Sequence, residues 1–510
     1  MSAPIRRLTG GPITPELLRL AWPVFVSHLL HTLYGLADML WVGRVSAEAI
    51  GAVSACFFAS WSLMAIGDLF TAGVGALVAQ AVGADRDADA SLVARTGLLA
   101  SALTGAVISA IGWFASPTLF RILFEDPRIA EMSANYFRIY SLIAPGFYAA
   151  FVIEAIFRSC GDSRTPMLFT LVGVLLNLVL DPLLILGAGP FPRLEVQGAA
   201  LATVASHAVV VALVAVLAWR RRIPLLGAIP ATAAPTHPSS VSAHPSSDPI
   251  HPSSASAHPS SDPIRPSADP LPRFSRADAW SIVRIGTPTA AVGILFSVVY
   301  LLISKLTESF GAPALAALGI VNRLESVNYL TSAAMGMGVA AMVGQNLGAR
   351  QPDRAERVAD RGAALITLTT GIVGGLYLLV PEFFVRLFTE DPAAVAESVN
   401  FLRIVAISQV FMGWEMVYGQ AFTGAGDTLP PMHISVWMSV LRVPLAWWFA
   451  DHTSGGLDGV WWVISLTCIL RGILVAGWFR VGRWKTRDAR FVPLPPAALV
   501  PSHGPDGPEG

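Results

Sequence analysis

Long apolar stretches dominate this chain and place the first constraint on its fold. About twelve of them reach the length of roughly 18 residues that lets a helix cross a bilayer. They lie near residues 17–42, 53–80, 92–114, 134–157, 166–186, 197–219, 281–303, 315–346, 362–380, 396–420, 431–450 and 459–479. Apolar residues make up 54% of the chain and charged residues 13%, against roughly 25% charged in a soluble domain. The sequence therefore predicts an all-α integral membrane protein with twelve transmembrane helices.

The same composition argues against several kinds of partner and cofactor. The formal net charge is zero and no basic run is interleaved with aromatic residues, so nucleic acid is not an expected partner. The three cysteines, Cys56, Cys160 and Cys468, are far apart and lie in or at the ends of apolar stretches. They are expected to pack as small apolar side chains, without a metal or redox role. The sequence holds no G-x-x-x-x-G-K-[ST] motif, so ATP is not the expected energy source and no cofactor is expected.

Basic residues are unevenly distributed between the two sides of the predicted bundle. If both termini lie on one side, the loops of that side hold most of the arginines, including Arg220 to Arg222 and the cluster from Arg480 to Arg490. The loops of the opposite side hold only Arg44, Arg121, Arg128, Arg193, Lys305 and Arg386. Loops rich in Lys and Arg stay on the cytoplasmic side. Both termini are therefore predicted to be cytoplasmic, in a multi-pass protein of the inner (plasma) membrane.

A segment of different composition separates the sixth and seventh predicted helices. Residues 237–250 read HPSSVSAHPSSDPI, and residues 251–264 repeat them almost unchanged. A segment rich in Pro and Ser cannot form a packed core, so residues 223–278 are predicted to be a disordered cytoplasmic linker. Its histidines recur every seven residues, which leaves metal binding open beside the simpler interpretation of a spacer; they are His237, His244, His251 and His258.

The two halves of the chain repeat each other at an offset of 265 residues. Matched pairs include Pro23 with Pro288, Gln80 with Gln345, Asp126-Pro127 with Asp391-Pro392, and Gly161-Asp162 with Gly426-Asp427. Residues 1–222 and 279–484 are therefore predicted to form two pseudo-symmetric six-helix bundles, followed by a cytoplasmic tail over residues 485–510. Six spans return the chain to its starting side, so the repeats are parallel. Two such bundles enclose a central cleft, and rocking them opens the cleft to alternate sides.

Several short motifs lie in particular predicted spans, and the Gly-Asp turns among them are paired between the two halves. They are Asp38-Met-Leu-Trp-Val-Gly43-Arg44, the segment from Gly75 to Ala84, and the two turns Gly161-Asp162-Ser-Arg-Thr-Pro166 and Gly424-Ala-Gly426-Asp427-Thr-Leu-Pro430. Together the motifs resemble the multidrug and toxic compound extrusion (MATE) family, over the whole chain except residues 225–275 and the tail. The resemblance implies a secondary antiporter. Such a protein expels organic cations or other amphipathic, drug-like compounds in exchange for H⁺ or Na⁺.

Polar residues inside the predicted helices of the first half suggest an ion-coupling site. Asp38 lies well inside the first span, where a carboxylate costs roughly 2.5–3.5 kcal/mol, and Tyr34 lies one turn earlier. Asn177 and Asp181 share a face of the fifth span, and Thr203 in the sixth could add a hydroxyl. Asp38, Asn177, Asp181 and Thr203 match the cation site of the branch named for the DNA-damage-inducible transporter. A structural hydrogen bond for Asp38 and a helix-end cap for Asp181 stay open.

The second half departs from the pattern of the other large branch, which places additional acids there. At the expected place in the seventh span this chain reads Ile294-Leu-Phe296-Ser, without an acid. Glu415 lies about one turn from the expected register in the tenth span, and Arg442 replaces Asn177 in the repeat. Glu415 and Arg442 are candidate residues of the substrate cavity, together with Tyr34 and Asp38.

Other polar residues inside the predicted spans match none of these motifs. Asp68 and Glu154 are acids at membrane depth whose roles the sequence leaves open. His28 and His31 fit either helix packing or a proton relay.

Two other functions share some of these features. A flippase for lipid-linked sugars would use the same duplicated bundle, but a diphosphate headgroup needs several basic residues in the cleft. An intramembrane enzyme would show paired Asp-rich motifs or a His/Glu cluster on loops, which this sequence lacks outside the linker. The sequence therefore favours a transporter that is not an enzyme. Its expected partners are small molecules and the lipid bilayer, and it is expected to be monomeric.

Overall fold

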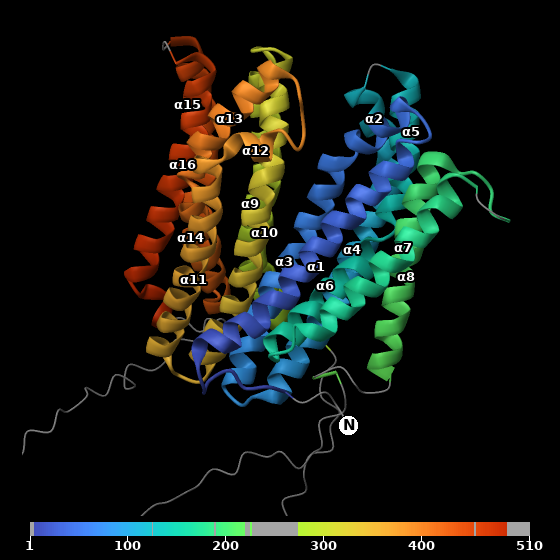
Figure 1. Ribbon diagram of the computed structural model, residues 1–510. Coiled ribbons are helices and arrows are strands. Elements are labelled where there is room, and N and C mark those ends of the chain that lie inside the picture. Colours follow the sequence, from blue (N-terminus) through green and yellow to red (C-terminus); the bar gives the residue numbers. More distant parts are fainter. Residues whose placement is uncertain are drawn as a thin grey trace, which may run out of the picture.

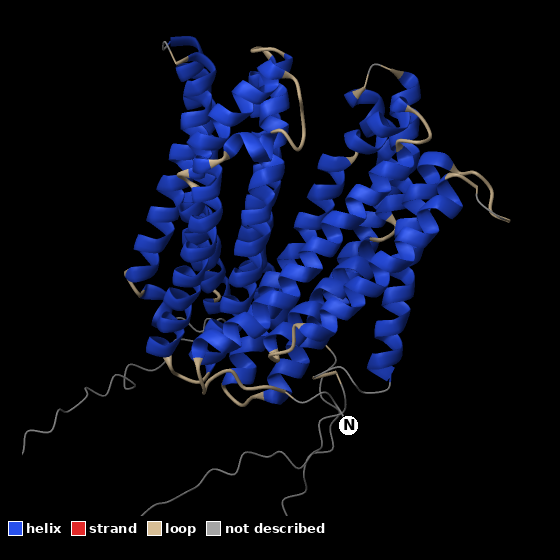
Figure 2. Cartoon of the chain, in the orientation of Figure 1, coloured by secondary structure: helices blue, strands red, loops and turns tan. Residues whose placement is uncertain are grey.

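A computed structural model describes residues 5–124, 126–187, 190–219, 225–226, 274–452 and 455–486. Helices joined by short connections make up this described part, and it contains no strand (Figure 2). Most of the predicted linker, with its histidine repeat, and nearly all of the predicted tail lie outside the described residues. Their predicted disorder and cytoplasmic location stay predictions.

The first half contains eight described helices, which follow the order of the first six predicted spans. They are α1 (Ile13–Val42), α2 (Ala47–Ala55), α3 (Phe57–Gly83), α4 (Asp87–Leu123), α5 (Pro127–Ser141), α6 (Ala144–Ser159), α7 (Arg164–Ile185) and α8 (Glu195–Trp219). The extra helices arise because two spans are interrupted. Cys56 separates α2 from α3, and a bend of 49° separates α5 from α6.

The second half repeats this order. Its described elements are α9 (Arg276–Glu308), α10 (Ala312–Gly348), α11 (Pro352–Leu379), α12 (Pro381–Val385), α13 (Pro392–Ala406), α14 (Gln409–Ala425), α15 (Leu429–His452), α16 (Gly456–Arg480) and the 3₁₀ turn η1 (Arg483–Thr486). The pair α13 and α14 is bent by 50°, as is its counterpart in the first half. By length and apolar composition, nine described helices could each cross a membrane. If the bent pairs α5–α6 and α13–α14 each count as one span, the number rises to as many as eleven. Helix α15 corresponds to the eleventh span of the predicted twelve-helix fold. It carries the buried Arg442.

Local sequence explains why helices begin at equivalent places in the two halves. Asp126 accepts a hydrogen bond from the backbone N–H of Arg128 at 2.8 Å, and Asp391 accepts one from that of Ala394 at 3.2 Å. Each aspartate precedes a proline, which suits the first turn of a helix because it has no N–H to satisfy. The sequence repeat therefore gives α5 and α13 the same kind of N-terminal cap.

The turn at Gly161 and Asp162 joins α6 to α7 as the sequence predicts. Gly161 has a φ of +79°, a conformation that favours glycine. Asp162 accepts hydrogen bonds from the backbone N–H groups of Arg164 at 2.9 Å and Thr165 at 3.2 Å. In the second half, Gly426 has a φ of +74° at the corresponding turn. Both turns are structural features of the fold.

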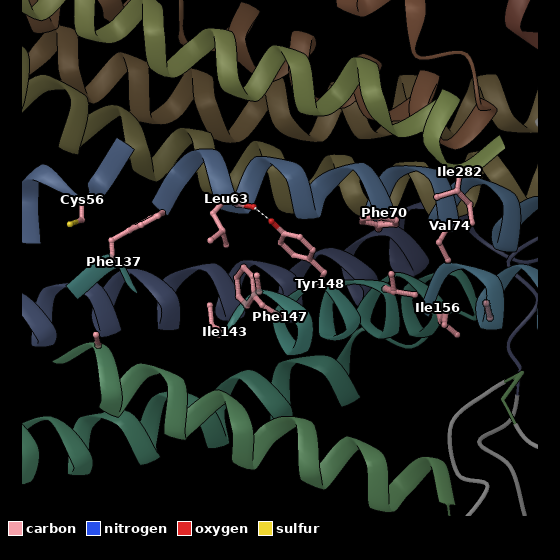
Figure 3. Close-up of a cluster of buried hydrophobic side chains, with 14 of the residues drawn as sticks. Cys56, Leu63, Phe70, Val74, Phe137, Ile143, Phe147, Tyr148, Ile156 and Ile282 are labelled. Carbon is pink, nitrogen blue, oxygen red and sulfur yellow. Dashed lines mark hydrogen bonds between the residues drawn. The ribbon is translucent and has the colours of Figure 1, made fainter. Parts of the chain in front are cut away.

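The buried core of the first half lies where the bent pair α5–α6 packs against α3 and α4 (Figure 3). Tyr148 is fully buried in this core, and its hydroxyl donates a hydrogen bond to the backbone oxygen of Leu63 at 2.7 Å. Ile282 of α9 belongs to the same cluster, although α9 begins the second half. The two halves therefore share buried contacts and do not pack as separate domains.

The halves are in contact at one end and diverge toward the other (Figure 1). At the contact, backbone lies directly on backbone. A Cβ atom added to Gly83 of α3 would lie 1.9 Å from the backbone oxygen of Gln345 in α10. One added to Gly348 would lie 2.0 Å from the backbone oxygen of Gln80. These two contacts are related by the sequence repeat, so the repeat places a glycine of each half against a carbonyl of the other.

Two glutamine side chains cross the same contact. Gln345 of the second half donates a hydrogen bond to the backbone oxygen of Ser159 in the first half at 2.7 Å. Gln80 of the first half donates one to the backbone oxygen of Gly424 in the second half at 3.2 Å. Both glutamines are buried, so these bonds satisfy polar groups that have left water. The contact is thus closely packed, and the two glutamine amides fix how the halves are aligned with each other.

We predict that Gly83→Ala destabilises the protein because the methyl group overlaps the backbone of Gln345. Overpacking of this kind costs about 1–3 kcal/mol, so the temperature of thermal unfolding should fall. Gly319→Ala is the matched control, since no atom lies within 4 Å of a Cβ added to Gly319 of α10. Heating the purified variants before size-exclusion chromatography measures the difference. Equal unfolding temperatures for the two variants would contradict the packing described.

Candidate functional site

The predicted polar residues of the first half come together between α1, α7 and α8. Asp38, Asn177, Asp181 and Thr203 are all buried, with exposed fractions of 7%, 1%, 0% and 2%. The hydroxyl of Tyr34 forms a hydrogen bond with that of Thr203, which ties α1 to α8. The side chains of Asp38 and Asp181 are near enough for their charges to interact. Sequence reasoning therefore identified a cluster that the fold assembles.

Regular helix geometry brings these residues together. Asn177 and Asp181 are four residues apart in α7, so both face α1. Tyr34 and Asp38 are likewise four apart in α1. Pro182 has no N–H to donate, so the helix leaves one backbone carbonyl without its usual partner next to Asp181. The site thus collects oxygen atoms at membrane depth.

Several polar atoms of this cluster have no partner in the described protein. No hydrogen bond is formed by Oδ1 of Asp38, by either carboxylate oxygen of Asp181, or by either amide atom of Asn177. No described Lys, Arg or His forms a salt bridge with either acid. Because a buried carboxylate without a cationic partner is costly, these groups fit a site that binds a proton or another cation. We refer to Tyr34, Asp38, Asn177, Asp181 and Thr203 as the acidic cluster.

Two tyrosines of α5 lie close to the acidic cluster, and sequence reasoning missed them. Tyr136 and Tyr140 both interact electrostatically with Asp38. Their rings are stacked with centroids 5.8 Å apart. Their spacing of four residues places them on one helix face and is the signal that could have found them.

The second half holds a separate polar network. Glu415 of α14 forms a salt bridge with Arg471 of α16 at 2.9 Å, and their side chains are 11% and 10% exposed. Ser435 donates a hydrogen bond to Glu415 at 3.3 Å. Arg442 donates from Nε to the hydroxyl of Thr467 at 2.8 Å. Glu415 and Arg442 thus lie together in the second half, in a different cluster from Tyr34 and Asp38.

Glu325 of α10 is a further acid of this network that sequence reasoning missed. It accepts a hydrogen bond from Nε2 of Gln409 at 2.7 Å, and Oε1 of Gln409 accepts one from Asn328 at 2.9 Å. Arg442 interacts electrostatically with Glu325. The sequence signal for Glu325 is an acid inside an apolar stretch. Arg323, two residues earlier, makes this part of the stretch look like the end of a helix. Glu325 therefore became recognisable only through its buried partners.

The structure also places Asp68 and Glu154, the acids whose roles the sequence leaves open. Glu154 accepts a hydrogen bond from Arg158 one turn later in α6 at 3.1 Å. Asp68 is exposed on α3 and interacts electrostatically with Tyr329 of α10, across the space between the halves. Asp68 and Glu154 also interact with each other electrostatically. They connect the interior of the first half to the region between the halves.

Comparison with known proteins agrees with the division of the chain into two similar halves. The MatE family model matches residues 23–183 and 288–448, one segment in each half. A probable multidrug resistance protein NorM of Thermotoga maritima is 26% identical over 482 residues, which cover 93% of this chain and 94% of that protein. A protein of Shewanella oneidensis named FAD transporter is 25% identical and covers 91% of this chain and 94% of its own length.

Solved structures share the fold along nearly the whole chain. One is reported as the outward-facing conformation of a multidrug resistance MATE family transporter; it has a TM-score of 0.78 at 22% identity, over 93% of this chain and 96% of that chain. Another is a MOP superfamily transporter from Pyrococcus furiosus, with a TM-score of 0.80 at 21% identity, over 94% and 98%. With the family model matched in both halves, the chain belongs to the MATE family of multi-pass membrane transporters.

Proposed function

We propose that the protein is a secondary active multidrug efflux antiporter, which exports organic cations or other amphipathic compounds in exchange for a cation. The observation that carries the proposal is the acidic cluster: two buried carboxylates without a basic partner in the described protein. Such a pair binds a positive charge in one step of a cycle and releases it in another. The relatives named multidrug resistance proteins support drug export as the use of this site.

Between H⁺ and Na⁺, the geometry of the cluster favours H⁺. A proton neutralises a carboxylate through a single oxygen, whereas Na⁺ needs several oxygens arranged around it. The hydroxyls of Tyr34 and Thr203 bond to each other. Protonated Asp181 is also the form least penalised by its complete burial.

Alternating access supplies the transport step in this proposal. The distribution of basic residues favours cytoplasmic termini in the inner (plasma) membrane. The halves then meet at the cytoplasmic end and diverge toward the outside, so the structure corresponds to an outward-facing state (Figure 1). Transport requires the contact of Gly83 and Gly348 to open while the opposite end closes.

The charge arrangement also bears on the alternative substrates. A flippase for lipid-linked sugars, or a carrier of an anionic compound such as the relative named FAD transporter, would need free basic groups beside the cleft. Arg471 is neutralised by Glu415, and Arg442 is buried beside it. We therefore propose cationic or neutral amphipathic compounds as the substrates, carried by a monomer.

We predict that Asp38→Asn and Asp181→Asn insert and fold normally but lose concentrative efflux. The amide keeps the size of the side chain and fixes the site in a neutral form that resembles the protonated acid. Efflux is measured by dye retention in cells, and folded yield by size-exclusion chromatography of the same cells. If Asp38 only joins helices, Asp38→Asn should instead lower the yield while transport per folded molecule stays near normal.

The capping aspartates provide the matched control. Asp162→Asn weakens the hydrogen bonds to the N–H groups of Arg164 and Thr165, and Asp427→Asn changes the equivalent turn of the second half. Both should reduce folded yield and leave transport per folded molecule unchanged. Wild-type efflux in Asp38→Asn would exclude Asp38 from the coupling site.

We also predict that the affinity for a cationic drug falls as the pH is lowered. Protons and the drug compete for the same pair of charges, so protonation at low pH removes the charge that attracts the drug. If one proton is displaced per drug molecule, the dissociation constant rises about tenfold per pH unit below the titration of the pair. Binding titrations with the purified protein at several pH values measure this slope. A dissociation constant independent of pH and of Na⁺ would contradict competition at the cluster.

A further inference from the structure

A small cavity lies inside the first half, directly beside the acidic cluster. It has a volume of about 50 Å³ and is enclosed by α1, α6, α7 and α8. Its polar lining consists of His31, Tyr34, Glu154, Thr170 and His207. Tyr34 also belongs to the acidic cluster, whereas Glu154 lies near the end of α6 where the two halves meet. The cavity therefore extends from the acidic cluster toward the contact between the halves.

The end of the cavity nearest the acidic cluster is built for proton exchange. His207 and Thr203 are one turn apart on α8, and Nδ1 of His207 lies 3.0 Å from the backbone oxygen of Thr203. A carbonyl can only accept, so Nδ1 carries the hydrogen and Nε2 of the neutral ring has a free lone pair. The edge of the His207 ring packs on Phe147, with centroids 5.5 Å apart. His31 is near enough to interact electrostatically with His207.

The other end of the cavity reaches the space between the halves. Glu154 is held by Arg158 at 3.1 Å, and both interact electrostatically with Asp68 of α3. Asp68 is exposed and faces Tyr329 of the second half. Asp68 also precedes Leu69, whose backbone oxygen packs against Gly286 at the contact between the halves. Asp68 is thus an exposed acid next to the contact that must open.

A cavity of this size can hold water. One water needs at least roughly 10–15 Å³ of such volume and two or more polar partners. The two histidines, Glu154 and the Tyr34 hydroxyl supply those partners along the lining. A short file of water and imidazole groups could therefore carry a proton where the side chains do not touch.

We propose that protons reach and leave the acidic cluster through this side route, from Asp68 by way of Glu154, His31 and His207. The proposal rests on the proposed H⁺ coupling and adds the residues that deliver the ion. Each transfer breaks one N–H or O–H bond and forms another, so no other reactant is needed. Since the route opens into the cleft at Asp68, it faces whichever side the cleft faces. The proton then has alternating access without a permanent leak through the membrane.

The charges around the two histidines suit transient protonation. Acids lie at both ends, with Asp38 and Asp181 on one side and Glu154 and Asp68 on the other. The Arg158 guanidinium, which interacts with His28 and with Asp68, opposes a long-lived positive charge in this region. The polar and titratable groups on the helices around the cavity and the acidic cluster are Tyr34 and His28 from α1, Asp68 from α3, Tyr136 and Tyr140 from α5, Glu154 and Arg158 from α6, Asn177 and Asp181 from α7, and Thr203 from α8. A proton on either imidazole ring is therefore attracted toward the acids on both sides and does not stay on the ring.

The test uses the full chain in proteoliposomes, with ethidium as the fluorescent cationic probe and either a pH gradient or a Na⁺ gradient imposed. His31→Gln and His207→Gln should each slow ethidium transport driven by the pH gradient at least about tenfold, because a relay group is lost. Equilibrium ethidium binding and its dependence on pH should stay as in wild type, since the acidic cluster is intact.

His433→Gln is the matched control. Nδ1 of His433 lies 2.7 Å from the backbone oxygen of Leu429 one turn earlier, the same contact that His207 makes, but on the exposed start of α15. This variant should transport at the wild-type rate. Asp68→Asn, at the exposed end of the route, should slow transport as the histidine variants do, and it serves if the histidine variants fold poorly.

The outcomes separate this route from the proposed function. If wild type responds to the pH gradient and the Asp68 and histidine variants transport at the wild-type rate, the route is wrong and the antiport proposal stands. If wild type responds to the Na⁺ gradient and not to the pH gradient, H⁺ coupling fails, and the route fails with it. A loss of ethidium binding in the histidine variants would assign these residues to the substrate site and overturn the relay.

Discussion

Close packing of glycine against backbone carbonyls is the constraint on which the rest of this structure depends. Gly83 and Gly348 lie against the carbonyls of the opposite half, and Gly286 lies against the carbonyl of Leu69 at a distance that leaves no room for a side chain. Carbonyls inside helices already accept hydrogen bonds from their own helix. Separation of the halves would therefore leave few backbone groups without partners. The side chains that would have to exchange protein partners for water include the amides of Gln80, Gln345 and Asn346 and the guanidinium of Arg354.

The sequence repeat gives both halves the same fold but not the same chemistry. At the positions that hold Asp38, Asn177 and Asp181 in the first half, the second half has Ile303, Arg442 and Ala446. All three replacements are buried. The charge of Arg471 is balanced by Glu415, whereas Asp38 and Asp181 have no such partner in the described protein. A coupling site in the first half is consistent with this difference, since Asp38 and Asp181 have no basic partner in the described protein.

Helix positions and the acidic cluster could be predicted because they depend on local pattern. Apolar length located the spans, the repeat paired the halves, and spacing by four placed Asn177 and Asp181 on one face. The partner of Glu415 could not be predicted, because the packing of α14 against α16 sets it and sequence spacing does not. The proximity of Tyr140 to Asp38 depends in the same way on the bend between α5 and α6. Sequence alone thus found the residues that share a helix and missed those joined by packing between helices.

The central claim is that the two halves move against each other about this contact, under the control of the charge on the acidic cluster. Distances between spin labels in the purified protein test it most directly. Arg128→Cys with Glu390→Cys reports on the diverging end, and Arg86→Cys with Gln351→Cys on the contacting end. All four positions are exposed, whereas the native cysteines are buried and should label slowly.

The account predicts that a change in pH shifts the two distances in opposite directions, one shortening as the other lengthens. Asp38→Asn should hold both distances in one state at every pH. Distances at the two ends that do not change with pH, or that change in the same direction, would contradict a rocking motion controlled by the acidic cluster.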